Sequence, residues 1–136
     1  MNYFFAEHLI FIPFVAYIVA TLLKGLFLSR KNVFNISAML STGGMPSGHS
    51  ALVASLATSI GIKYGPSNDL FVLSLVFAAI VIYDAMNIRY QSGLHAQTLN
   101  NIKGEKKFNE SLGHLPSETL VGSMVGVFIA AVLMQI

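Results

Sequence analysis

Two short stretches of the sequence each set a histidine beside residues that begin a helix. Residues 43–50 read GGMPSGHS. Pro46 suits a first helical position, so we expect a helix to start at Pro46 and its free N–H groups to bind an anion. Ser47 adds a hydroxyl group, Gly48 lets an anion approach the backbone, and His49 transfers protons near neutral pH. The stretch predicts chemistry on an anionic oxygen ester, although a Ser/Gly-rich helix cap with an incidental histidine fits it too.

The second stretch, residues 113–118, reads GHLPSE and again precedes an apolar run. Its histidine, His114, stands two residues before a proline, and Glu118 follows four residues after the histidine. A carboxylate at that spacing can hydrogen-bond the imidazole and fix its tautomer. The pattern predicts an activated histidine. Gly122 and Gly126 then form a GxxxG pair, which predicts close packing of helices.

Charged residues outside these stretches supply further candidates. Lys24 and Lys31 are seven residues apart with Arg30 adjacent, so on one helix they would converge on a phosphate or contact anionic headgroups. Asp84 ends an apolar run, where a carboxylate is costly unless it is paired. Arg89 is either the partner of Asp84 or a phosphate clamp.

The elements that must position these residues are strongly apolar. The chain has 136 residues, of which 54% are hydrophobic and 10% charged, and its mean hydropathy is +0.67. This composition excludes an ordinary soluble protein and predicts one all-α transmembrane domain over residues 1–136. We expect a helical bundle of about four transmembrane helices, at residues 9–23, 46–62, 70–86 and 116–136.

Small residues along the second span place it centrally in the bundle. Between the third and fourth spans, Leu94, Leu99 and Ile102 recur at helical spacing, which predicts an interfacial helix broken at Gly104. His95 within that helix is interpreted as a solvated histidine.

The charge distribution predicts an orientation. Basic residues gather between the first two spans and between the last two, whereas only Lys63 lies on the opposite side. The positive-inside rule then directs both motif loops to the cytoplasm. We therefore expect an integral protein of a bacterial inner membrane that has no nucleic-acid partner.

Together, PSGH at residues 46–49 and GHLPSE at 113–118, with the two glycines that follow, resemble the type 2 phosphatidic acid phosphatase superfamily. The fuller set, GGMPSGHS, YDAM at residues 83–86 with Arg89, and GHLP, is most similar to its divergent bacterial and plant branch, which is related by motif to acid phosphatases and vanadium haloperoxidases. The resemblance implies that His114 attacks phosphorus and becomes a phosphohistidine, that Glu118 orients it, and that His49 protonates the leaving alcohol. It further implies that Ser47 and the Gly48 amide hold the phosphoryl oxygens, with no metal or other cofactor.

The sequence departs from the family pattern at two cationic positions. Lys24 fits the first motif, but Lys31 replaces its arginine, and Phe108 occupies the arginine position of the third motif. Preorganised cations stabilise the charge of a transition state, so a replacement is needed. The candidates are Arg89, Arg30 and Lys107.

These features predict a membrane lipid-phosphate phosphatase that hydrolyses a phosphomonoester or a pyrophosphate. Its partners are then the lipid substrate and the membrane, and a homodimer would complete so small a bundle. The alternative is a non-catalytic protein that binds or moves a phospholipid through the same anion pocket. A vanadate-dependent oxidase and a metal site formed by His49, His95 and His114 are more distant alternatives.

Overall fold

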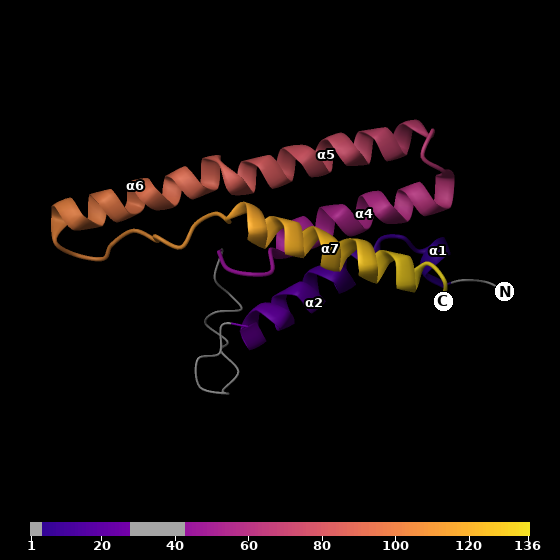
Figure 1. The fold of residues 1–136 in the computed structure, drawn as a ribbon, viewed down its shortest axis with the longest axis horizontal. Coiled ribbons are helices and arrows are strands. Elements are labelled where there is room, and N and C mark those ends of the chain that lie inside the picture. The colour runs from indigo at the N-terminus through magenta and orange to yellow at the C-terminus, as the bar shows by residue number, and fades with distance from the viewer. Residues whose placement is uncertain (1–3, 28–42) are drawn as a thin grey trace.

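All regular structure in residues 4–27 and 43–136, the parts of the chain that the computed structural model describes, is α-helical. Figure 1 shows the helices in order along the chain. They are α1 (Phe4–Glu7), α2 (Phe11–Phe27), α4 (Gly48–Tyr64), α5 (Asp69–Met86), α6 (Ile88–Lys103) and α7 (Pro116–Leu133). Helices α2, α4, α5 and α7 lie at the positions of the four predicted spans, and α2 and α4 have 17 residues each.

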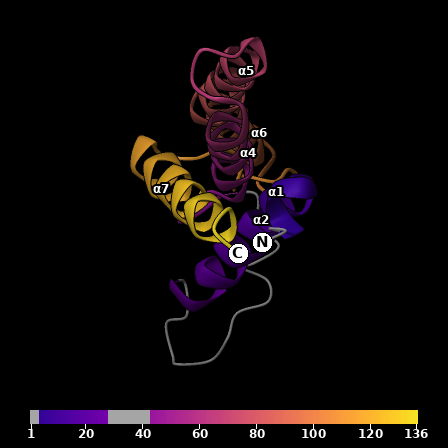
Figure 2. The ribbon, with the colours of Figure 1, turned by 90° about the vertical axis from the view of Figure 1, so that its right-hand side faces the viewer.

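Helix α4 is the centre of the bundle, as its small residues predicted. It packs against α2, α5 and α7, and Figure 2 shows it between α5 and α2. Its buried positions include Ala51, Ser55 and Ser59, which are fully buried. The two serine hydroxyls donate hydrogen bonds to carbonyl groups of α4 itself, at 2.8 and 2.7 Å. Polar side chains are therefore satisfied within the helix, and neighbouring helices can approach closely.

The predicted GxxxG contact is confirmed and lies between α7 and α4. A Cβ atom added at Gly122 would collide with the Ser47 carbonyl group, and one at Gly126 would collide with the Ala51 carbonyl group. The two glycines thus face two residues that are also four positions apart. This matching register lets the α7 and α4 backbones meet at the end that carries the histidines.

The helix that follows the first histidine motif, α4, starts later than predicted. Ser47 has an extended conformation (φ −72°, ψ 116°) and is the N-cap of α4, so Gly48 is the first helical residue. The prediction of a start at Pro46 was wrong because the Ser47 side chain supplies the capping acceptor, which receives a hydrogen bond from the Ser50 N–H group. In the second motif, Pro116 is the first helical residue, as expected.

Helices α5 and α6 follow one another in nearly the same direction and form a long rod (Figure 1). The predicted break is confirmed, because α6 ends at Gly104, which has a left-handed conformation (φ +71°). The chain then runs back beside α6 to reach α7 (Figure 1). Buried Asn100 fastens this return loop: it donates to the Phe108 carbonyl and the Glu110 carboxylate and accepts from the Lys107 and Phe108 N–H groups.

The surface of the bundle is apolar along its helices, as expected for a protein surrounded by lipid. The α5–α6 rod and α7 are each long and apolar enough to cross a membrane, and α2 is a shorter apolar helix. Little of the apolar stretch on each of the two longer helices is buried; on α5, for example, Leu73 is 66% and Ile80 62% exposed. A soluble core helix would bury these residues. The predicted all-α membrane bundle is therefore confirmed.

Candidate active site

A backbone hydrogen bond joins the two histidine motifs. The N–H group of Ser47 donates to the carbonyl oxygen of Glu118 at 3.1 Å. The cap of α4 and the first turn of α7 are thereby held together at one end of the bundle, next to the close contact of Gly122 with Ser47. Residues some 65 positions apart in the sequence, His49 and His114, are brought into one region by this arrangement.

His114 and Glu118 form the pair that their spacing predicted. Nδ1 of His114 lies 3.1 Å from Oε2 of Glu118. The same carboxylate oxygen accepts the N–H group of Leu115 at 3.0 Å, so the capping of α7 also holds the carboxylate in place. The backbone N–H group of His114 donates to the Ala85 carbonyl of α5 at 3.0 Å, which ties the backbone of His114 to α5. Glu118 thus orients the imidazole, and the contact with Ala85 holds the backbone that carries it.

The surroundings of His114 favour a neutral ring. His114 is only 3% exposed, and burial lowers its pKa below the ordinary value of about 6.5. Hydrogen bonding to Glu118 acts in the opposite direction, and the nearby charge of Lys24 adds to the lowering of the pKa. Burial outweighs the carboxylate. The Gly44 backbone also hydrogen-bonds the ring and acts in the same direction as Glu118. A nucleophilic His114 requires that this contact leave the lone pair of the second ring nitrogen free.

His49 lies in the first turn of α4 and is half-buried. The Tyr17 ring of α2 contacts it edge to face, with 6.2 Å between ring centres and 75° between ring planes. The charges of Arg89, His114, Lys24 and Asp84 all act on the His49 ring. The structure therefore brings together six of the predicted site residues, which come from α2, α4, α5, α6 and the start of α7: Lys24, His49, Asp84, Arg89, His114 and Glu118.

Asp84 is paired, as expected for a carboxylate at the end of a span. The Arg89 Nε–H group donates to its Oδ2 at 2.6 Å. The side chains are 28% exposed for Asp84 and 48% for Arg89, so the pair lies at the surface of the site rather than in its interior. This charge-assisted hydrogen bond orients the guanidinium group, whose charge acts on His49.

Ser47 and Gly48, which were predicted to bind phosphate, make structural contacts that were not predicted. Ser47 is fully buried, and its hydroxyl oxygen accepts a hydrogen bond from the Ser50 hydroxyl at 3.0 Å. The space beside Gly48 is taken by the Tyr17 ring, which a Cβ atom at residue 48 would approach to 3.0 Å. Each residue therefore has a packing role, and its contact with phosphate stays a prediction.

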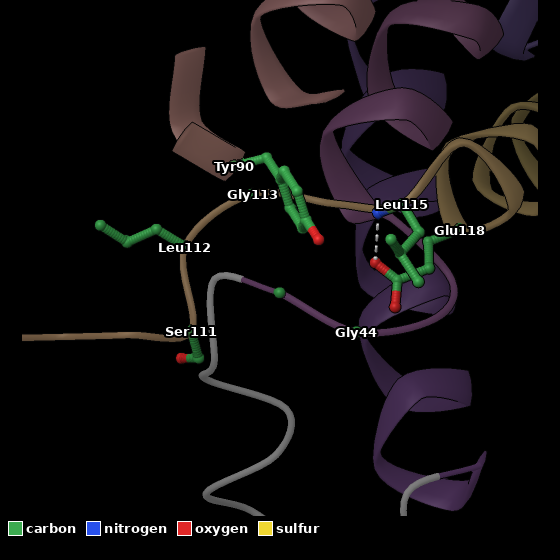
Figure 3. A pocket seen from close by; sticks show the side chains of 8 residues that line it. Gly44, Tyr90, Ser111, Leu112, Gly113, Leu115 and Glu118 are labelled. Carbon is green, nitrogen blue, oxygen red and sulfur yellow. Dashed lines mark hydrogen bonds between the residues drawn. The ribbon is translucent and has the colours of Figure 1, made fainter. Parts of the chain in front are cut away.

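A cavity of about 330 Å³ opens beside Gly113 and Leu115, the neighbours of His114 in the sequence (Figure 3). It lies between the segment before α4, the start of α6 and the segment before α7. The lining residues are Gly43, Gly44, Tyr90, Ser111, Leu112, Gly113, Leu115 and Glu118. The sequence analysis missed Tyr90, although its place directly after Arg89 was a signal that could have drawn attention to it.

The remaining predicted residues are not part of this cluster as described. Arg30 and Lys31 lie outside the described residues. Lys107 lies in the return loop, where its N–H group donates to Asn100, and His95 is exposed on α6. Within residues 4–27 and 43–136, no group of three or more histidine, aspartate or glutamate side chains is arranged to hold a metal ion.

Comparison with known proteins places this chain in a family. The family model described as "Divergent PAP2 family" matches residues 5–129, which is nearly the whole chain. The chain belongs to the divergent PAP2 family. This divergent PAP2 protein is 33% identical to the uncharacterized membrane protein YuiD of Bacillus subtilis (strain 168), over 71% of this chain and 74% of that relative. No solved structure matches it. The family and this relative agree with the apolar surface in identifying a PAP2-related membrane protein.

Proposed function

We propose that this divergent PAP2 protein is a membrane lipid-phosphate phosphatase that hydrolyses a phosphomonoester or a pyrophosphate through a phosphohistidine. The observation that supports this best is the 3.1 Å contact between His114 Nδ1 and Glu118 Oε2, with His49 close by. Simple binding of phosphate does not require a buried base with an orienting carboxylate.

In the first proposed step, the lone pair of His114 attacks phosphorus. The bond between phosphorus and the leaving oxygen breaks as the phosphorus–nitrogen bond forms, and the electron pair leaves with that oxygen. Protonated His49 gives its proton to the leaving oxygen, so the product is a neutral alcohol from a monoester. Glu118 stabilises the positive charge that develops on the His114 ring.

In the second step, water attacks the phosphorus of the phosphohistidine. His49, now neutral, accepts a proton from this water, and the electron pair of the phosphorus–nitrogen bond returns to His114. Inorganic phosphate leaves, and both histidines regain their starting protonation states. The cycle needs no oxidant, reductant or further reactant beyond water.

Two cations support the phosphoryl group in this proposal. Lys24 is 5% exposed, and its charge acts on Glu118 and both histidines. Arg89 replaces the arginine of the family's third motif, whose position Phe108 occupies here. Asp84 holds the Arg89 guanidinium group in position. Cations fixed in a partly buried site stabilise a phosphoryl transition state more than mobile cations in water.

We further propose that the protein lies in a bacterial inner membrane with the histidine end in the cytoplasm. The basic residues Lys103, Lys106 and Lys107 are exposed in and after the last turn of α6, whereas Lys63 lies at the opposite end of α4. This distribution follows the positive-inside rule.

A specific observation favours a second candidate function, the binding or movement of a phospholipid without hydrolysis. His114 is almost fully buried and hydrogen-bonds the Gly44 backbone, and the Ser47 hydroxyl is engaged within the α4 cap. These contacts enclose groups that a phosphatase must present to its substrate.

The test is phosphate release from a panel of lipid phosphates by purified protein in detergent, with EDTA present. Under the phosphatase proposal, wild-type protein releases phosphate and the His114→Ala variant does not. A phosphate-labelled protein trapped from wild type and absent from the variant would identify the intermediate. Folded wild-type protein that binds lipid phosphates and releases no phosphate would instead support the binding function.

A further inference from the structure

The cavity beside His114 differs in chemistry from the cationic cluster. We propose that this cavity is the subsite for the uncharged leaving group of a phosphomonoester. We also propose that Tyr90 determines its specificity by donating a hydrogen bond to an oxygen atom of that group. This proposal rests on the phosphatase function, because the bound group is a leaving group only if the ester is hydrolysed. Binding of that group can be tested separately.

The position of the cavity suits a group attached to the reacting phosphorus. Two lining residues, Gly113 and Leu115, flank His114 in the sequence, and a third, Glu118, is its hydrogen-bond partner. The backbone of Gly44, also in the lining, is hydrogen-bonded to the His114 ring. A ligand in the cavity therefore lies directly against the segment that carries the nucleophile.

The lining disfavours an anionic group and suits an apolar one. Among the lining residues that the structure describes, the side chain charged at neutral pH is the carboxylate of Glu118. Lys24 and Arg89, which attract phosphate, act on His49 and are not lining residues. A second phosphate in the cavity would meet the Glu118 carboxylate, whereas an alkyl chain would contact Leu112 and Leu115. The phosphoryl group thus faces the cations and the remainder of the substrate faces the cavity.

Tyr90 is held in position for this role by its backbone. Gly113 has a left-handed conformation (φ +82°), and a Cβ atom there would collide with the backbone of Tyr90. The start of α6 can therefore pack directly against the segment before α7. Figure 3 shows the Tyr90 ring extending from α6 toward Leu115 and Glu118, with the hydroxyl group at its leading end. A neutral phenol is a hydrogen-bond donor, so it suits an ether, ester or hydroxyl oxygen on the ligand.

The experiment uses two non-hydrolysable phosphonates of equal chain length. One carries an ether oxygen near the phosphonate group, and the other has carbon throughout. Binding of each to the full-length protein in detergent is measured by calorimetry for wild type, Tyr90→Phe and Tyr83→Phe. Tyr83 is a matched control because it lies on α5, is 63% exposed and is outside the lining.

We expect wild type and Tyr83→Phe to bind the ether phosphonate about 3- to 10-fold more tightly, the effect of one neutral hydrogen bond. Tyr90→Phe should bind both phosphonates with the lower affinity. The proposal is overturned if folded wild type shows no preference or no binding, if Tyr90→Phe keeps the preference, or if it weakens both ligands equally. Phosphate release is scored separately: a Tyr90-dependent preference without any release by wild type rejects the phosphatase and keeps the subsite.

Discussion

Ser47 and Glu118 are joined through their backbones, the Ser47 N–H group donating to the Glu118 carbonyl at 3.1 Å. Each of these residues also serves its own helix, because Ser47 caps α4 and the Glu118 carboxylate caps α7. The two helix starts therefore form one unit. Since His49 and His114 belong to these starts, the spacing between the two histidines depends on backbone contacts rather than on flexible side chains.

Glu118→Gln should abolish most turnover while leaving the fold intact. Glutamine keeps an oxygen that can accept the Leu115 N–H group, but it loses the negative charge that stabilises a charged His114 ring. We expect turnover to fall by about 100- to 10,000-fold, as for other orienting carboxylates. Phosphate release and thermal unfolding in detergent measure the two properties. Glu105→Gln, at an exposed turn, is the control, and turnover of Glu118→Gln within twofold of wild type would exclude the orienting role.

Gly122→Ala and Gly126→Ala should each destabilise the bundle. An added methyl group would collide with the carbonyl groups of Ser47 and Ala51, so α7 must move away from α4. Overpacking of this kind costs about 1–3 kcal/mol in the free energy of unfolding. Thermal unfolding in detergent should show a lower midpoint for both variants. Met124→Ala, at a 63% exposed position between the glycines, should unfold close to wild type, and an equal loss there would refute this explanation.

Arg89→Ala should lower turnover more than binding, because the guanidinium group is proposed to stabilise the transition state. We expect kcat to fall by about 10-fold or more, in the range of a lost charge-assisted contact. Asp84→Asn should have a smaller effect, since it loosens the orientation of Arg89 and keeps its charge. Lys103→Ala, at the far end of α6, controls for the loss of surface charge. Unimpaired turnover in Arg89→Ala would remove Arg89 from the phosphate site.

The lowered pKa of His114 has a defined consequence for stability. A histidine whose pKa is lower in the folded state favours unfolding as pH falls below its unfolded value of about 6.5. Wild-type protein should therefore lose more stability between pH 7 and pH 5 than His114→Gln. Thermal unfolding at both pH values gives this difference. His95→Gln, on the exposed side of α6, is the matched control, and identical pH dependence in wild type and His114→Gln would contradict the neutral buried ring.

Asn100→Ala should release the return loop from α6. The variant loses all four hydrogen bonds of this buried side chain, each of which contributes about 0.5–1.5 kcal/mol. Hydrogen exchange at the Lys107 and Phe108 amides should become faster. Asn101→Ala changes the exposed neighbour and should leave both amides protected. Unchanged exchange in Asn100→Ala would show that other contacts hold the loop.

The sequence predicted the features that depend on local spacing. The pairs formed by His114 with Glu118 and by Asp84 with Arg89 are four and five residues apart, so one helical turn or junction brings each pair together. The GxxxG contact was also predictable, because two glycines one turn apart mark a helix face that can approach another backbone. Apolar runs marked the positions of the four long helices, of which the α5–α6 rod and α7 are long and apolar enough to cross a membrane.

Features that depend on packing between distant segments were missed. Tyr90 enters the cavity because Gly113, 23 residues later, admits its backbone, and no periodicity reports such a contact. The start of α4 was misplaced because both Pro46 and Ser47 suit helix starts. The choice depended on which residue accepts the hydrogen bond of the Ser50 N–H group, and that residue is Ser47. Tyr17 was overlooked because its contact with His49 joins two helices that are distant in the sequence.

The α5–α6 rod also sets the depth of the cavity. A helix rises about 1.5 Å per residue, so the 21 steps from Asp69 to Tyr90 span about 32 Å, close to the roughly 30 Å of a bilayer hydrocarbon core. A crossing α5 that starts at one face of the core would place Tyr90 at the level of the lipid headgroups of the other face. Under the proposed phosphatase function, a lipid would present its phosphate to His114 while its tails remain in the leaflet, and only the released phosphate would enter water.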